Sequence, residues 1–212
     1  YKGRQVLYSL EGAGRGDYHA ENVSVSSEGT SFTLVHNEER ADFVTPVIGR
    51  HNVLNIVGAL AMAHELGMSY EELYPQVRKL QSVPHRLQLL DRGNVALIDD
   101  AYNSNPTGAK AALDTLALFK GFRILVTPGM VELGEKMEEC NRTFGKQAAK
   151  ACDYAILVGK RQAEPILQGL LEGGFPKEKI YVAETIGEAI SVAYSLPTGG
   201  EKPIILLEND LP

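Results

Sequence analysis

Hydrophobic and polar residues follow two different patterns along this chain. Within residues 1–47, four stretches alternate with a period of two and are rich in β-branched and aromatic residues, which predicts short strands. The stretch "SSEGTSFTLVHNEERADFVTPV" predicts a hairpin that turns near residues 37–40. Apolar residues then recur at helical spacing over 51–67, and Ser69 with Glu72 has the capping-box pattern that begins a second helix.

Helices and strands alternate in the second half of the chain. Two more strands are expected before residue 100, joined by a turn at 91–94. Helices are then predicted at 105–119, 136–151, 162–173 and 185–195, and a short apolar strand follows each one. This repeat is typical of a parallel sheet with helical crossovers. We therefore expect an α/β protein with a mixed α/β segment over 1–99 and a Rossmann-like, mostly parallel domain over 100–212.

Composition excludes several classes of function. The net charge of −6 over 212 residues argues against non-specific binding to nucleic acid, which needs a basic face. No apolar run approaches the roughly 18 residues of a membrane span, and the N-terminus lacks the apolar core of a signal peptide. Cys140 and Cys152 have no C-x-x-C spacing, so we expect reduced thiols in a cytoplasmic protein.

The first candidate cluster is "GRHNVLN", at the start of the helix predicted over 51–67. His51 or Asn52 could cap this helix. Asn55 lies one turn after Asn52 on the same face, and two amides so placed could also hydrogen-bond a flat polar ligand such as an adenine ring. In "VPHR", Arg86 is either a surface residue or an oriented one, and its planar fork suits phosphate oxygens.

The second cluster, "IDDAYNSNP", joins an apolar strand to a helix. Asp99 and Asp100 end the strand, where α/β proteins bind ligands, and one of them could accept hydrogen bonds from ribose hydroxyls. Solvation of a strand end is the alternative. Asn103 could form a turn, and Ser104 or Asn105 could cap the next helix.

The loop "TPGMVELGE", 127–135, follows the first strand of the repeat. It lacks the G-x-G-x-x-G pattern, and the chain has no G-x-x-x-x-G-K-[ST]. Its glycines could simply close a loop. The residues alone therefore predict a Rossmann-like domain with polar groups suited to a nucleotide.

Four segments together resemble the Mur ligase family: "GRHNVLNIVGALAMAHELG", "VPHRLQLL" with "VALIDDAYNSNPTGAKAALDTL", "PGMVELGE", and "ACDYAILVGKRQAEPI". The resemblance covers roughly residues 40–197. It implies that residues 1–99 are the later part of the family's central ATPase domain and that 100–212 are its C-terminal ligase domain. The family's P-loop, and the modified lysine that helps to hold magnesium, lie upstream of the matching part. Since the chain begins abruptly and contains neither, we expect a portion of a longer ligase that is inactive by itself.

The resemblance also implies site residues, with ATP and Mg²⁺ as cofactors and no metal ligands within this chain. Arg86 would contact the terminal phosphates and act in catalysis, and Asp99 would hold the ribose. Further nucleotide contacts would come from Asn52, Asn55, Tyr102, Asn103 and Asn105. The loop facing the incoming amine would contribute Gly129, Met130, Glu132, Gly134 and Glu135. A polar junction at 99–106 that touches nucleotide would couple ATP binding to domain closure, which keeps water from an acyl phosphate.

Within the family, the motifs most resemble those of the ligase that adds D-alanyl-D-alanine to UDP-N-acetylmuramoyl-tripeptide. The resemblance implies a role in peptidoglycan synthesis, and so in the cell wall, cell shape and cell division. We expect those two substrates as partners, a monomer, and neither nucleic acid nor membrane. One departure matters: where the family's last strand runs into a K-G-S-type turn, this chain has Glu208, Asn209 and Asp210. A ligase for another amino acid or amine, akin to folylpolyglutamate or cyanophycin synthetases, is therefore one alternative. A non-catalytic nucleotide-binding module is another.

Overall fold

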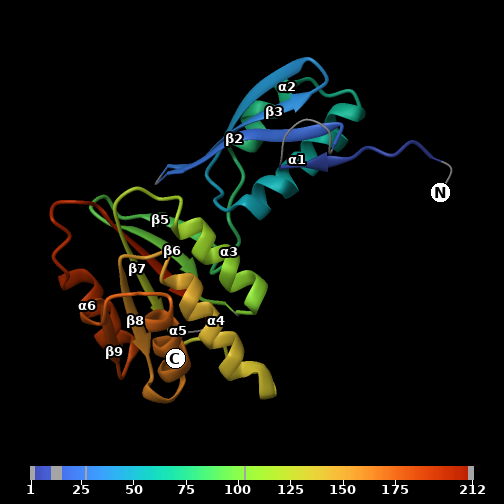
Figure 1. The fold of residues 1–212 in the computed structure, drawn as a ribbon. Coiled ribbons are helices and arrows are strands. Elements are labelled where there is room, and N and C mark those ends of the chain that lie inside the picture. The colour runs from blue at the N-terminus through green and yellow to red at the C-terminus, as the bar shows by residue number, and fades with distance from the viewer. Residues whose placement is uncertain (1–2, 11–15, 27, 103, 210–212) are drawn as a thin grey trace. The chain divides into compact units, whose positions relative to one another are not determined.

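The computed structural model describes residues 3–10, 16–26, 28–102 and 104–209, without the side chains of residues 161 and 162. The chain forms two compact units, Tyr1–Ser82 and Val83–Pro212. Figure 1 shows the first in blue to cyan and the second in green to red. The division falls earlier than the expected boundary at 99/100, for a reason that the second sheet makes clear.

The first unit is built on a four-stranded sheet with the order β1-β2-β3-β4. Its strands are β1 (Tyr8–Ser9), β2 (Tyr18–Ser26), β3 (Gly29–His36) and β4 (Glu39–Thr45). The predicted hairpin at 37–40 is confirmed, because β3 and β4 are antiparallel and His36 pairs with Glu39. Asn37 has a φ of 54° at this turn, a conformation that asparagine tolerates better than most residues.

Two helices cover this sheet: α1 (Arg50–Glu65) and α2 (Tyr70–Val77). The apolar face of α1 includes Val53, Val57 and Leu60, and it packs in one core with strand residues such as Phe32 and Phe43. The predicted capping box at Ser69 and Glu72 is present at the start of α2. Helical spacing in the sequence therefore located α1, and the capping-box pattern located the start of α2.

The second unit contains a six-stranded sheet with the order β5-β6-β10-β7-β8-β9. The strands are β5 (Gln88–Asp91), β6 (Ala96–Asp100), β7 (Phe122–Thr127), β8 (Tyr154–Val158), β9 (Ile180–Ala183) and β10 (Pro203–Glu208). β5 is an antiparallel edge, and the other strands run parallel. Because β6 pairs with both β5 and β10, residues 88–100 belong to this sheet and not to the first unit.

Four helices complete three layers: α3 (Pro106–Leu116), α4 (Met137–Ala148), α5 (Lys160–Glu172) and α6 (Ile186–Ser195). From β6 to β9 the chain moves in one direction across the sheet, so right-handed crossovers place α3, α4 and α5 on one face. The return from β9 to β10 reverses direction and places α6 on the other face, as Figure 1 shows. The expected Rossmann-like α/β architecture is confirmed.

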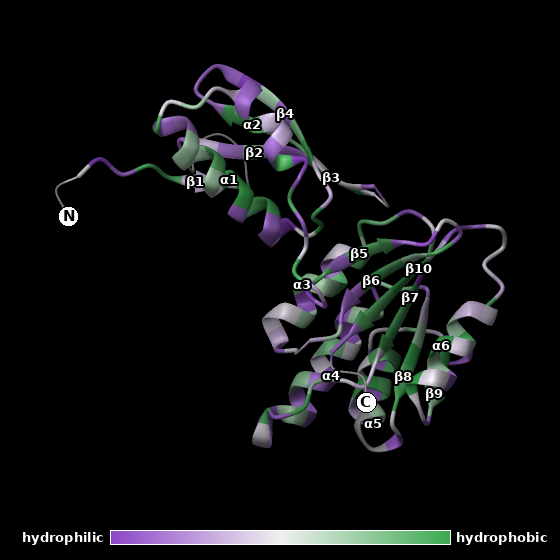
Figure 2. Cartoon of the chain, turned by 180° about the vertical axis from the view of Figure 1, so that it is seen from behind, coloured by the Kyte–Doolittle hydropathy of each residue, from purple (hydrophilic) through white to green (hydrophobic). Residues whose placement is uncertain are grey.

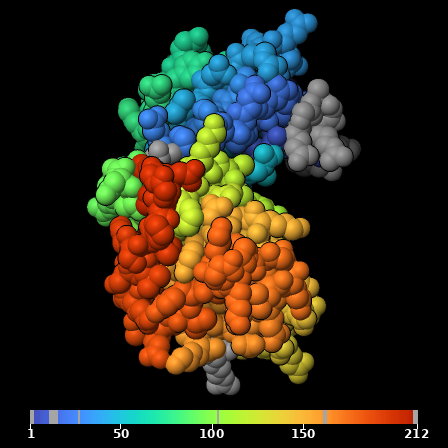
Figure 3. Space-filling model, turned by 60° about the vertical axis from the view of Figure 1, so that its left-hand side comes forward, coloured from blue at the N-terminus to red at the C-terminus, as the bar shows by residue number. Residues whose placement is uncertain are grey.

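The core of the second unit is almost wholly apolar. Its central strands are green in Figure 2, which marks hydrophobic residues. In the space-filling view, the visible face of this unit is formed largely by the orange and red segments that carry α5, β9 and α6 (Figure 3). Several buried polar residues interrupt the core, namely Asp99, Ser104, Thr115, Thr127, Asn141, Glu208 and Asn209. All of these except Thr115 lie near the carboxyl ends of β6, β7 and β10. Among the described residues, no helix is long and apolar enough to cross a membrane.

Candidate functional site

Arg86 lies in a strained turn that leads into β5. The residues on either side, His85 and Leu87, have φ values of 60° and 47°, in the left-handed region that side chains rarely adopt. The amide of Arg86 donates to the Val83 carbonyl at 3.1 Å. Backbone in this region costs about 1–3 kcal/mol per residue and persists only where neighbours enforce it.

The two adjacent acids at the end of β6 enforce this turn. His85 Nδ1 donates to Asp99 Oδ2 at 2.9 Å, and the Leu87 amide donates to Asp100 Oδ1 at 3.0 Å. Asp99 Oδ1 also accepts from the Ala101 amide at 3.2 Å. One carboxylate therefore holds the residue before Arg86, and the other holds the residue after it.

The side chain of Arg86 lies over an aromatic ring. Its guanidinium carbon is 4.6 Å from the ring centroid of Tyr102, a cation–π geometry. Tyr102 is 60% exposed and Arg86 is also exposed. Among the described residues, Arg86 forms no ion pair. The site thus presents an oriented, unneutralised planar cation of the kind that binds phosphate oxygens.

Asn105 has a structural role. Its Oδ1 accepts hydrogen bonds from the amides of Thr107 and Gly108 at 3.1 and 2.9 Å, so it is the N-cap of α3, with Pro106 at the first helical position. The expected cap is confirmed. The expected nucleotide contact stays a prediction. Asn103, predicted to lie beside it, falls outside the described residues.

Asn52 and Asn55 belong to the first unit, whereas the other candidates belong to the second. Neither His51 nor Asn52 caps α1, because the N-cap is Gly49 without a side-chain cap. Asn52 is half-buried, and its Nδ2 donates to the Ile48 carbonyl at 2.8 Å. Asn55 is exposed at the rim of an apolar pocket of about 340 Å³ between α1 and α2. A contact of either amide with adenine remains a prediction.

The loop after β7 is rigid at its start and exposed at its end. The Gly129 amide donates to Thr127 Oγ1 at 2.9 Å, and Asn141 bonds both the amide and the carbonyl of Met130, at 2.8 and 2.9 Å. Gly129 has a φ of 81°, and a Cβ there would lie 2.7 Å from Ile166 Cδ1 and 2.8 Å from Asn141 Oδ1, so any other residue would be strained at this position. Further along, Glu132, Gly134 and Glu135 are exposed, and the first two also have positive φ.

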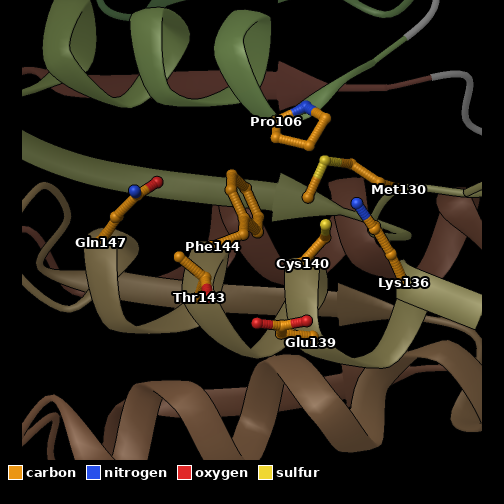
Figure 4. Close-up of a pocket in the computed structure, with 8 residues that line it drawn as sticks. All are labelled: Pro106, Met130, Lys136, Glu139, Cys140, Thr143, Phe144 and Gln147. Atoms are coloured by element: carbon orange, nitrogen blue, oxygen red, sulfur yellow. The ribbon is translucent and has the colours of Figure 1, made fainter.

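A pocket of about 240 Å³ lies beside this loop. It is lined by Pro106, Met130, Lys136, Glu139, Cys140, Thr143, Phe144 and Gln147. Figure 4 shows Cys140 and Phe144 pointing from α4 towards Pro106 at the start of α3. Lys136 forms no ion pair with any described residue. The pocket combines an apolar floor with the ammonium group of Lys136 and the carboxylate of Glu139, which suits a small ligand that carries charged and apolar groups.

The most deeply buried acid of this region is Glu208, one of the residues at which the chain departs from the family's K-G-S-type turn. It is 0% exposed at the end of β10. It accepts hydrogen bonds from the hydroxyls of Ser104 and Thr127. Burial raises the pKa of Glu208, and the two hydroxyl donors oppose that effect. The partners come from distant parts of the chain, so no local pattern could have revealed this cluster.

The described residues do not fit a magnesium site. No group of three or more histidine, cysteine, aspartate or glutamate side chains among them could hold a metal ion. The adjacent acids Asp99 and Asp100, which hold the turn of Arg86, already accept hydrogen bonds from His85 and from the Leu87 amide. No catalytic step is therefore assigned to a metal bound by this part of the chain.

Two family models match the chain, the Mur ligase middle domain over residues 2–63 and the "Mur ligase, glutamate ligase domain" over residues 85–207. The chain belongs to the Mur ligase family, whose members are ATP-dependent ligases. Its similarity extends to the UDP-N-acetylmuramoyl-tripeptide–D-alanyl-D-alanine ligase of Escherichia coli K12. The two are 37% identical over 163 residues, which cover 74% of this chain and 35% of that protein.

Solved structures agree with this placement. MurF from Acinetobacter baumannii matches 97% of this chain and 44% of its own, with a TM-score of 0.75 and 26% identity. MurF ligase from Thermotoga maritima in complex with ADP matches 96% of this chain and 44% of its own, with a TM-score of 0.75 and 21% identity, which shows a shared fold. The chain thus spans between a third and a half of the length of these relatives.

Proposed function

We propose that the complete protein carrying this chain is an ATP-dependent ligase that joins D-alanyl-D-alanine to UDP-N-acetylmuramoyl-tripeptide through an acyl phosphate. Family membership and the E. coli relative support the reaction class and the substrates. The observation within this chain that carries the proposal is the braced turn of Arg86. Asp99 and Asp100 fix its two neighbours, and Tyr102 orients its guanidinium.

The proposed reaction has two steps. The γ-phosphoryl group of ATP passes to the terminal carboxylate of the tripeptide, and ADP leaves. The amine of the dipeptide then attacks the acyl carbon, the C–O bond to phosphate breaks, and inorganic phosphate leaves with the bonding electrons. The attacking nitrogen releases one proton, which leaves a neutral amide bond. Negative charge gathers on the transferring phosphoryl oxygens, where a fixed planar cation stabilises it most. Arg86 is suited to this role because its strained turn is held before substrate arrives.

The pocket beside Met130 is the place we assign to the dipeptide. Lys136 would pair with its carboxylate, while Met130 and Phe144, each 1% exposed, would contact its methyl groups. A cavity of about 240 Å³ lies just below the usual range of 300–1,000 Å³ for drug-sized ligands, so it suits a smaller molecule. The five loop residues named from the sequence would form its border on the β7 side.

The decisive assay measures phosphate release by the complete protein with ATP, magnesium and UDP-N-acetylmuramoyl-tripeptide, with and without D-alanyl-D-alanine. We expect release that depends on the dipeptide, and a loss of about 100-fold or more in kcat for Arg86→Ala. Arg92→Ala is the matched control, since Arg92 is also exposed but lies in the turn between β5 and β6. Equal activity of both variants would contradict the role of Arg86.

A related ligase with another amine substrate is the second candidate. It is favoured by Glu208 and Asn209, which stand where the family usually has a K-G-S-type turn. In that case, phosphate release would be absent with D-alanyl-D-alanine and present with another amino acid or amine. Binding of ATP without turnover for any amine would instead support the third reading, a nucleotide-binding module.

A further inference from the structure

The carboxyl end of β10 connects two segments that are far apart in sequence. β10 lies between β6 and β7 in the sheet, so its last residue has a neighbour on each side. One carboxylate oxygen of Glu208 accepts from Ser104 Oγ, and the other accepts from Thr127 Oγ1 at 2.7 Å. Ser104 follows β6, and Thr127 ends β7. We call Ser104, Thr127, Glu208 and Asn209 the carboxyl-end clasp.

Glu208 also determines how the Thr127 hydroxyl is used. That hydroxyl has one proton, which it donates to Glu208, and its lone pair accepts the Gly129 amide at 2.9 Å. An ionised carboxylate can only accept, so it fixes the direction of this chain of hydrogen bonds. The position of Gly129 therefore depends on Glu208 through Thr127.

Asn209 makes a second connection between the same segments. Its amide donates to the Asp100 carbonyl at 3.2 Å, and its Nδ2 donates to the Gly129 carbonyl at 2.5 Å. It is 1% exposed and has a φ of 68°. The left-handed conformation turns its side chain towards the loop after β7 while its backbone stays paired with the end of β6.

An apolar residue at the end of β10 would have a lower free-energy cost of burial than Glu208 has. The preceding residues on this strand, Ile204 to Leu207, are apolar, and burying a carboxyl group costs several kcal/mol before its partners compensate. Positions that break such local rules are expected at functional sites. Glu208 joins two segments. The first follows Asp99 and Asp100, the two acids that hold the turn of Arg86. The second borders the proposed dipeptide pocket.

We propose that Glu208 and Asn209 are positioning residues that fix the loop 127–135 against Asp100 and Ser104 and thereby set the affinity for the amine substrate. Neither residue need touch a substrate. The kinetic part of this inference rests on the proposed ligase function, whereas its structural part can be tested without any activity.

The test uses Thr127→Val and Asn209→Gly in the complete protein. Valine keeps the shape of threonine but frees the Gly129 amide, and glycine accepts the left-handed backbone of Asn209 but removes the side-chain bond to the loop. Thr115→Val is the matched control, because Thr115 is 2% exposed and donates to the Ala111 carbonyl within α3, outside the clasp. Hydrogen exchange at Gly129 and Met130 and the kinetic constants for the amine are measured for each.

Both clasp variants should raise the exchange rate of the loop amides and the KM for the amine. We expect about a tenfold increase in each, because each variant loses one buried hydrogen bond. The kcat at saturating amine should stay within about twofold, and the control should change neither quantity. Unchanged exchange, or faster exchange with unchanged KM, would overturn the inference. Absence of turnover with every amine in the unsubstituted protein would defeat the proposed function alone, and the exchange measurement would still decide the clasp.

Discussion

The guanidinium carbon of Arg86 lies 4.6 Å from the centroid of the Tyr102 ring, although sixteen positions separate them in the chain. Arg86 precedes β5 and Tyr102 follows β6, and the antiparallel pairing of these strands brings the two residues together. The arginine is thus oriented by three residues of one short segment: Asp99 and Asp100 act on its neighbours, and Tyr102 acts on its side chain.

Removal of the Tyr102 ring should weaken the proposed nucleotide site. We expect Tyr102→Leu to raise the KM for ATP about two- to fivefold, because an exposed cation–π contact contributes about 0.5–1 kcal/mol. Tyr102→Phe keeps the ring and serves as the control. A leucine variant with the KM of the unsubstituted protein would show that the ring does not orient Arg86 in the working enzyme.

Two substitutions at Asn105 can distinguish its role in stability from a role in nucleotide binding. Asn105→Ala should lower the free energy of unfolding by about 1 kcal/mol, measured in urea, because two amides of α3 lose their acceptor. Asn105→Asp retains the acceptor oxygen and should leave stability nearly unchanged. If Asn105 also contacts nucleotide, the aspartate variant will show a raised KM for ATP at normal stability. If its role is the cap alone, that KM will not change.

The two cysteines should differ in reactivity. Cys140 is half-buried in the pocket wall, whereas Cys152 is 5% exposed, and burial raises the pKa of its thiol to about 12. Because the thiolate is the reactive form, a disulfide reagent at neutral pH should label the native protein at Cys140 first. Cys140→Ser should abolish this rapid labelling, and Cys152→Ser should preserve it. Rapid labelling of both thiols would show that the second unit opens readily.

Substitution of Lys136 should change the KM for the dipeptide and leave the KM for ATP unchanged. We expect Lys136→Gln to raise the KM for the dipeptide about two- to fivefold, as the loss of one exposed ion pair allows. Lys150→Gln is the control, because Lys136 directly precedes α4 whereas Lys150 lies two residues after its end. An effect of Lys136→Gln on the KM for ATP alone would place the dipeptide elsewhere.

Glu208 should make stability depend on pH. Burial raises its pKa above the ordinary value of 4.5, so the folded protein binds this proton more tightly than the unfolded chain does. Its contribution to the free energy of unfolding therefore falls as the pH rises above 4.5. Glu208→Gln lacks this titration. Urea unfolding at about pH 4.5 and pH 8 should show the unsubstituted protein losing stability relative to the variant. Parallel pH dependence, or the opposite slope, would contradict the burial.

Local patterns in the sequence determined the elements themselves. Helical spacing located α1, the serine-to-glutamate spacing located the start of α2, and Asn105 with Pro106 marked the start of α3. These features depend on residues within one or two turns of each other, so they can be predicted from the chain alone. The repeat of helix and apolar strand likewise determined the α/β class.

Tertiary structure decided the grouping of these elements and the roles of their polar ends. Residues 88–100 resemble the hairpins before them, yet their second strand, β6, pairs with β10, which lies more than a hundred residues later. Ser104 and Glu208 are 104 positions apart, and Thr127 and Glu208 are 81 apart. The sequence shows that these residues are polar. Only strand order decides that they meet, because the partner of a strand end is chosen by pairing across the whole sheet and not by the residues beside it.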